Sequence, residues 1–546
     1  MKRISRYYHT IKPLKLEQIL YRLKYRFFSL KSLSAQSSEN LSAKRWSLSN
    51  LQAGEQSLFE NSEVCFLNKK AYIITPQDWH DESQHSKLWL YNLHYFNDLN
   101  SVGGERRYNL QKKFILKWIK ENPPLNGNGW EPYPISLRLV NWIKWCQFNQ
   151  EYSVDILCSI EQQADALMRQ LEFHILGNHL FANAKALVFA GSFLNSDRAN
   201  DYISKGLELL KREVLEQFMA DGGHFELSPM YHCILLWDLI DLYNLALACD
   251  DARFNPRLSD WADVIGRGLR WLSVMCHPDG GISFFNDAAF GIAPSPKEIF
   301  SFAALVGIVT NDTNLFGLST LESSGYSRLQ RGSFTLFFDH AEVGPSYLPG
   351  HAHADSLSIE LSLGRQRIFV NSGTSEYGEG PERQRQRSTP AHNTLFVKDK
   401  NSSDVWAGFR VGRRAQISGV EFEATQKFVS ARAQHDGYCH FKKGLTHVRT
   451  CKVFDDKVLI KDELGASSTN TVMAHFHLHP DVEAEVIDTR SVRLILVSGD
   501  TLLFSTDVPV RLEETTWHPE FGKSVPTTRI VLVVPNQHFT SELTLA

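Results

Sequence analysis

The sequence predicts an all-helical domain followed by an all-β domain. Its 546 residues are too many for a single hydrophobic core, so at least two domains are expected. From about residue 88 to residue 305, apolar residues recur at helical spacing. From about residue 325 onward they alternate with period two, which is typical of strands. Because the helical and strand patterns occupy separate parts of the chain, we expect separate domains.

The helical part contains seven periodic segments, at 110–120, 134–148, 155–173, 179–193, 202–218, 229–248 and 261–276. Linkers rich in Gly, Asn, Asp and Pro separate them. Helices without intervening strands are expected to pack as a bundle, a solenoid or an α/α toroid. The linkers Asp221-Gly222-Gly223-His224 and Pro278-Asp279-Gly280-Gly281 resemble each other, which favours helical hairpins wound around a ring.

The strand segments are 333–338, 356–363, 367–371, 394–397, 446–454, 457–462, 492–497, 501–505 and 528–534. We expect them to form stacked antiparallel sheets over residues 326–546, after a helical domain at 61–325. Residues 1–60 form an N-terminal extension in which 14–28 is expected to be a basic amphipathic helix. A helix that docks on the protein or is solvated is favoured there over one that touches anionic lipid.

The composition narrows the function classes. A formal net charge of -3, without a large basic excess in either domain, argues against nucleic acid as the main partner. Twelve Trp and seventeen Tyr suit a sugar-binding cleft, although large helical cores also use them. The eight Cys include no Cys-x-x-Cys pair, so buried free thiols are expected. No apolar run resembles a signal peptide or is long enough to span a bilayer, so a cytoplasmic location is expected.

A histidine-rich region marks the start of the β domain. His351 and His353 are separated by one residue and would face the same side of an extended strand. His392 lies about one hairpin further on, so the three imidazoles are expected to converge on one pocket. Histidine suits proton transfer near neutral pH and metal ligation. A single histidine at a strand end is usually just solvated, but three in this arrangement indicate a site.

Three further candidates begin or end helices. Gly177-Asn178-His179 opens a helix, where an N-cap is the plain structural role for Asn178. Tyr231 follows Ser228-Pro229 at another helix start, where packing is the usual role of a tyrosine. Asn286-Asp287 is interpreted as a loop turn rather than as a chemical group.

This inventory of Asn, Tyr and His favours proton abstraction beside a carboxylate. Nucleophile-elbow, Walker and dinucleotide motifs are missing in convincing context, and paired carboxylates for hydrolysis are not obvious. An amide donor can stabilise the charge that develops on the carboxylate, while Tyr or His moves the protons. A basic Tyr, with an ordinary pKa of about 10, would need cationic neighbours.

At these residues the chain resembles the heparinase II/III family of polysaccharide lyases, from about residue 89 onward. The landmarks are Trp89-Leu90-Tyr91-Asn92-Leu93-His94-Tyr95-Phe96, Trp130-Glu131-Pro132-Tyr133-Pro134, Gly177-Asn178-His179, Glu226-Leu227-Ser228-Pro229-Met230-Tyr231-His232, His351-Ala352-His353-Ala354-Asp355, Asn371-Ser372-Gly373-Thr374 and Ala391-His392-Asn393-Thr394. The resemblance implies an incomplete α/α toroid followed by an antiparallel β-sandwich, with the active site between them. It also implies β-elimination on uronate-containing acidic polysaccharides.

The resemblance further implies individual roles. Asn178 would neutralise the uronate carboxylate with His179 beside it, Tyr231 would act as the acid or as both acid and base, and His351 would be the other proton-transfer group. His353 and His392 match positions that bind a metal, often zinc, in several members. Asn371 stands where the family has Asp, and because a neutral carbonyl is a weaker ligand, an Asn–His network is the alternative.

Four more residues are expected to bind substrate: Arg138, Glu226, Arg383 and Arg387. The two last arginines are expected on a loop before His392, where they either grip anionic groups or form a solvated face. A lyase is the leading interpretation, with a uronate C5-epimerase and a non-catalytic glycan-binding protein as alternatives. Exported lyases of this family suggest the periplasm, whereas the missing secretion signal favours an intracellular protein or one beside an envelope polysaccharide assembly system. The sequence does not determine the oligomeric state.

Overall fold

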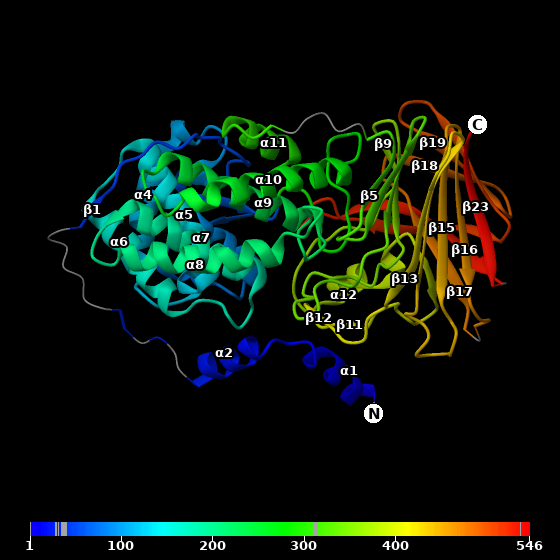
Figure 1. Cartoon of the computed structure of the whole chain (residues 1–546), viewed down its shortest axis with the longest axis horizontal. Coiled ribbons are helices and arrows are strands. Elements are labelled where there is room, and N and C mark those ends of the chain that lie inside the picture. Colours follow the sequence, from blue (N-terminus) through cyan, green and yellow to red (C-terminus); the bar gives the residue numbers. More distant parts are fainter. Residues whose placement is uncertain are drawn as a thin grey trace.

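The computed structural model describes residues 2–27, 30, 32–33, 41–309, 315–468, 470–535 and 537–546. A helical domain and a β domain lie side by side, and the N-terminal helices α1 (Lys2–Ile11) and α2 (Leu16–Phe27) run along one edge of the pair (Figure 1). Within the described ranges, no helix combines the length and the apolar character needed to cross a bilayer. All eight cysteines are free, as the sequence predicts, but only Cys146, Cys233 and Cys451 are buried, and the other five are partly exposed.

The helical domain confirms the seven predicted segments as α4 to α10. Its helices are α3 (Lys87–Tyr95), α4 (Tyr108–Glu121), α5 (Pro132–Asn149), α6 (Val154–Arg169), α7 (Gly177–Phe193), α8 (Ala199–Gln217), α9 (Pro229–Ala248), α10 (Asn255–Met275) and α11 (Pro296–Leu305). Almost every residue of α7 and α9 is buried, because these helices are apolar on all sides and form the centre of the domain. The short strands β1 (Ser42–Ala43) and β4 (Leu194–Asn195) pair, as do β2 (Glu63–Phe66) and β3 (Lys69–Tyr72).

The two similar linkers adopt the same turn, one after α8 and one after α10. In each, the Asp side chain accepts a hydrogen bond from the amide of the second glycine, at 3.0 Å for Asp221 and 2.7 Å for Asp279. The first glycine has a positive φ, +90° at Gly222 and +95° at Gly280, which a residue with a side chain rarely adopts. The chain then continues toward Glu226 and Asp287 respectively, so both turns position residues of the site described below.

The β domain is built from three antiparallel sheets that share one core. The first contains, in order, β5 (Gly317–Leu321), β6 (Tyr326–Arg331), β7 (Phe334–Asp339), β8 (Ile359–Leu363) and β9 (Gln366–Phe369). The second contains β13 (Ile417–Ala424), β14 (Phe428–His435), β15 (His447–Phe454), β16 (Lys457–Leu464), β23 (His538–Leu545), β20 (Thr501–Thr506), β19 (Ser491–Leu496) and β18 (Val482–Asp488). The third contains β10 (Leu395–Val397), β17 (Val472–His477), β22 (Val525–Val534) and β21 (Val510–Trp517). The predicted stacked sheets are thus present.

Two local predictions in the histidine-rich region were wrong. Residues 351–355 are irregular and not a strand, although His351 and His353 still reach one partner. The segment predicted as a loop before His392 forms the short helix α12 (Pro381–Arg387), which begins at a proline. Next to it lies the hairpin β11 (Val405–Trp406) and β12 (Arg410–Val411). The expected boundary at 325/326 falls in the β5–β6 hairpin.

Candidate functional site

A buried carboxylate, Asp287, lies at the centre of the site. His351 Nδ1 donates to its Oδ2 at 2.8 Å, and His353 Nε2 donates to its Oδ1 at 2.8 Å. The Arg383 guanidinium bonds both oxygens, with Nη2 at 2.7 Å. Burial opposes ionisation, but Arg383 and the two histidines hold the pKa of Asp287 well below its usual range. We call these four residues the Asp287 hub.

The Asp287 hub corrects the interpretation of Asn286-Asp287 as a simple turn. Asn286 does have the positive φ of a turn residue, +57°. Its role is to direct the neighbouring carboxylate into the junction between the domains, where Arg383 of α12 meets it. The hydrogen-bonding partners of the Asp287 carboxylate come from 64 to 96 residues away in the chain. No local sequence pattern predicts contacts over such distances along the chain.

His351 is the member of the hub that reaches solvent. Its side chain is 13% exposed, whereas that of Asp287 is fully buried. The hydrogen bond from Nδ1 to Asp287 fixes the orientation of the imidazole. The other ring nitrogen, Nε2, then lies 3.6 Å from Glu226 Oε2. The ring stacks on the Tyr231 ring with centroids 3.9 Å apart. A histidine oriented by a buried carboxylate is well suited to accept a proton, because the carboxylate stabilises the imidazolium that results.

Tyr231 is fixed at the first turn of α9, where the Ser228 side chain accepts a hydrogen bond from the Tyr231 amide. Its hydroxyl lies 3.0 Å from the hydroxyl of Tyr377, a residue that the sequence interpretation did not single out. Burial, with Tyr377 adding to it, raises the pKa of Tyr231 well above its ordinary value. The phenol therefore stays protonated at neutral pH, which suits a proton donor better than a base.

Asn178 and His179, at the start of α7, form a second group of site residues. The Asn178 side chain is hydrogen-bonded to Tyr133, whose ring lies 4.3 Å from the His179 ring. His179 Nδ1 is 2.9 Å from Glu172 Oε1. Burial alone would lower the pKa of His179, but the Glu172 carboxylate outweighs it and the pKa is raised. The His179 side chain is 25% exposed, and its raised pKa favours the charged form beside the Asn178 amide.

Glu172→Gln is expected to lower the pKa of His179. The carboxylate raises that pKa, so its loss leaves burial as the dominant influence and the imidazole becomes neutral at a lower pH. An NMR titration of the His179 ring measures the shift. Glu208→Gln is the matched control, because that side chain is 68% exposed and lies on α8. An unchanged His179 titration in Glu172→Gln would contradict the assignment.

Glu226 lies close both to His351 and to the Asn178–His179 pair. Its carboxylate lies 3.6 Å from His351 Nε2, and both carboxylate oxygens are buried without a hydrogen-bond partner, close to the start of α7 at Asn178. Burial raises its pKa, against the opposing effects of His351 and His179. The structure thus brings Asn178, His179, Glu226, Tyr231 and His351 into one cluster.

A group of metal-ligand type lies behind the hub, formed by His353, Asp355 and His392. One ligand atom from each lies within 4.8 Å of the others. His353 Nδ1 and His392 Nε2 are buried without a hydrogen-bond partner, while the other nitrogen of each ring is held by Asp287 or Asn371. Two free imidazole nitrogens and a carboxylate are a donor set that suits zinc. Asn371 Oδ1 contacts His392 Nδ1 at 3.2 Å, so Asn371 is placed to orient a ligand.

The arginines expected to bind substrate are all enclosed. Arg138 lies in the helical core over the Trp118 ring and bonds Gln163. Arg383 belongs to the Asp287 hub, and Arg387 donates to the carbonyl oxygen of Ala352. Both side chains are buried, so Arg383 links the β domain to Asp287 at the domain junction and Arg387 is bonded within the β domain.

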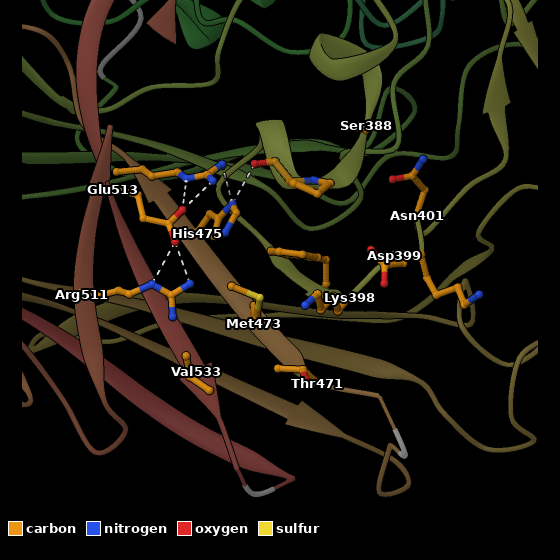
Figure 2. Close-up of a pocket in the computed structure, with 14 residues that line it drawn as sticks. Ser388, Lys398, Asp399, Asn401, Thr471, Met473, His475, Arg511, Glu513 and Val533 are labelled. Carbon is orange, nitrogen blue, oxygen red and sulfur yellow. Dashed lines mark hydrogen bonds and ion pairs between the residues drawn. The ribbon is translucent and has the colours of Figure 1, made fainter. Parts of the chain in front are cut away.

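A separate cavity of about 640 Å³ borders the turn Thr389–Ala391 that precedes His392. Figure 2 shows Glu513 with Arg511 beside it, and His475 near the turn. Arg511 and Arg529 both bond Glu513, at 2.6 Å and 2.7 Å. Because these cations are already paired, the cavity offers less free positive charge than its residue types suggest. None of the Asp287 hub residues lines it.

Two family descriptions match the sequence. "Heparinase II/III N-terminus" matches residues 33–300, and "Heparinase II/III-like, C-terminal" matches residues 314–545. A "Heparin-sulfate lyase" of Bacteroides stercoris is 24% identical over 443 residues, covering 69% of this chain and 61% of that protein. The protein of the same name from Bacteroides thetaiotaomicron is 23% identical over 457 residues, covering 74% and 63%. The chain therefore spans less than two thirds of the length of these curated relatives.

Solved structures share the fold. "Crystal Structure of Heparinase III" superimposes with a TM-score of 0.65 at 16% identity, covering 97% of this chain and 89% of that one. A heparan sulfate lyase HepC mutant from Pedobacter heparinus gives a TM-score of 0.60 at 17% identity, covering 96% and 87%. A helical domain followed by an antiparallel β domain is therefore the architecture of this chain too.

Proposed function

The chain belongs to the heparinase II/III family, and from that premise we propose that it is a lyase that cleaves a uronate-containing acidic polysaccharide by β-elimination. The observation that carries the proposal is the stacking of Tyr231 on His351, opposite Asn178 and His179. An amide, a cation, a protonated phenol and an oriented imidazole are the groups that this reaction needs. The names of the relatives make heparan-type polymers the first substrates to test.

The first step is activation of the uronate. The Asn178 amide donates to the substrate carboxylate and the His179 imidazolium neutralises its charge, so the C5 proton becomes more acidic. Stabilising the charge that develops on a carboxylate is the same principle as an oxyanion hole. In the free protein, contacts with Tyr133 and Glu172 hold the Asn178 and His179 side chains in position before substrate binds.

The second step is elimination. His351 Nε2 takes the C5 proton, the C5–H electrons form the C4=C5 double bond, and the C4–O4 bond breaks. Tyr231 donates its phenolic proton to the departing O4. Asp287 and Glu226 stabilise the His351 imidazolium, which returns the proton through solvent.

A screen of the purified protein against heparan-type, alginate-type and other uronate polymers tests the proposal. The ultraviolet absorbance of the unsaturated uronate is expected to rise with one of them. A C5-epimerase would leave the absorbance flat while exchanging C5 hydrogen with deuterated water. Binding without either signal would indicate a glycan-binding protein.

We also propose that zinc binds at His353, Asp355 and His392. A bound ion would fix the ring of His353 and thereby the Asp287 hub.

Zinc at about 100 times its Kd is expected to stabilise the protein by about 2.7 kcal/mol, measured as a rise in Tm. Asp355→Asn should remove most of the affinity. Asn371→Ala, which only loosens His392, should weaken binding by about 10–100-fold. Equal zinc affinity in wild type and Asp355→Asn, measured by calorimetry, would exclude this ligand set.

A further inference from the structure

The helices α1 and α2 precede the family match, which begins at residue 33, and they are bound to both domains. On α1, Arg6 makes a two-bond ion pair with Asp404 of the β domain at 2.7 and 2.9 Å. On α2, the buried Gln18 donates to the carbonyl oxygen of Ile175, and the Tyr25 hydroxyl donates to that of Leu171 at 2.6 Å. One face of each helix is thus fixed to the protein body.

The opposite face of each helix is apolar and exposed. On α2 the exposed residues recur at intervals of four, three and four, and on α1 at intervals of four and three, so each set lies on a single face. The exposed side chains are Ile4 at 75%, Tyr8 at 58%, Ile11 at 51%, Leu16 at 69%, Leu20 at 54%, Leu23 at 51% and Phe27 at 72%. We call these seven residues the apolar stripe. The two helices lie along one edge of the molecule (Figure 1), and the exposed fractions show that the side chains of the stripe are accessible to solvent. Clustered exposed apolar side chains of this kind mark an interaction site.

Basic residues outnumber acidic ones around the apolar stripe. Residues 4–27 contain six Lys and Arg against the single acid Glu17, and four of these cations remain after Arg6 pairs with Asp404 and Lys15 pairs with Glu216. Beside α1 lies a cavity of about 640 Å³, and its ionisable side chains are mostly basic: His9, Lys12, Arg413, Arg414 and His440, with Asp436 as the acid. Burial and the nearby Arg413 lower the pKa of both His9 and His440, which disfavours their charged forms, so the positive charge of this cavity comes from Lys12, Arg413 and Arg414. Exposed apolar side chains flanked by cations complement a surface with an apolar interior and an anionic outer layer.

We propose that α1 and α2 dock this protein on an anionic membrane surface. The apolar stripe would enter the acyl region, while Lys12, Lys24 and Arg26 contact the phosphate groups and the cavity beside α1 receives a headgroup. This is the geometry of an interfacial amphipathic helix, which lies in the plane of the membrane and does not cross it. The docking of this helix on the protein, which the sequence favoured, is observed, and the proposal concerns the opposite face. It does not depend on the proposed catalytic activity.

Vesicle flotation of the full chain tests the proposal. The protein is expected to float with phosphatidylglycerol-containing vesicles, to bind phosphatidylcholine vesicles more weakly, and to be released by salt. Leu20→Ser with Leu23→Ser should weaken binding by at least about tenfold, because two exposed apolar side chains are lost from the membrane contact. The control Leu215→Ser changes a 78% exposed leucine on α8 and should bind as the wild type.

A second variant, Lys24→Gln with Arg26→Gln, tests the charge contribution and decides the matter if the leucine variant does not fold. It should lose preference for anionic vesicles while keeping the wild-type Tm. Failure of the wild type to bind anionic vesicles would overturn the proposal. So would a concentration-dependent dimer in sedimentation that Leu20→Ser with Leu23→Ser abolishes, because a second copy of the chain would then cover the apolar stripe.

Discussion

Tyr231→Phe is expected to lower kcat by about 10²–10⁴-fold, the usual contribution of a positioned proton donor. The substitution removes the phenolic proton and leaves the ring that stacks on His351. KM should change little, because the groups proposed to hold the carboxylate, Asn178 and His179, remain. The measurement is the initial rate of unsaturated-uronate formation over a range of substrate concentrations.

The matched control is Tyr243→Phe, a change of the same kind further along α9. Tyr231→Phe also loses the hydrogen bond to Tyr377, at a cost of about 0.5–1.5 kcal/mol, so a Tm measurement should accompany the kinetics. A Tyr231→Phe protein with the wild-type rate would remove the phenol from the reaction. His351→Ala would then show whether the imidazole serves as both base and acid.

Asp287→Ala is expected to destabilise the protein by about 3–5 kcal/mol, because it leaves the buried Arg383 guanidinium without its counter-ion. It also releases both histidines of the Asp287 hub, so activity should be lost. Thermal and denaturant unfolding, followed for each domain, measure the effect. Asp287→Asn keeps the shape and should be milder in stability, but His351 would lose the anion that stabilises its protonated form.

An exposed ion pair of the same chemistry provides the control. Asp404→Ala breaks a two-bond pair with Arg6 whose side chains are 27% and 42% exposed, and the expected cost is only about 0–1 kcal/mol. Combining Asp287→Ala with Arg383→Met should recover part of the lost stability, because the unpaired charge is removed. If Asp287→Ala costs no more than Asp404→Ala, the Asp287 hub is not the stabilising centre inferred here.

The helices were predictable because their signal is local. Apolar spacing identified α4 to α10, and the all-round apolar character of α7 and α9 explains their burial. The strand signal was weaker: β13 and β18 are largely exposed, and although Val482, Ala484 and Val486 of β18 do alternate with polar residues, neither strand was predicted. Helix α12 was missed because six charged or polar residues after a proline resemble a loop.

The site was predictable only where motifs mark it. Asn178, Tyr231 and His351 stand in recognisable motifs, and the structure brings them together. Asp287 and Tyr377 were missed because their importance arises from contacts across 64 and 146 residues of chain. Asp355 was overlooked as a ligand because Asn371 occupies the family's position, whereas the structure sets the Asp355 carboxylate beside the two free imidazole nitrogens.

The origin of the hub residues has a consequence for how activity can be gained or lost. Asp287 comes from the segment after α10, whereas His351 and Arg383 come from the β domain. Under the proposed mechanism, neither part alone contains both the proton acceptor and the carboxylate that orients it, so activity requires assembly of the two. Fragments expressed separately should be inactive until mixed. A mutation at the domain junction that displaces Asp287 should abolish the proposed activity without changing His351 itself.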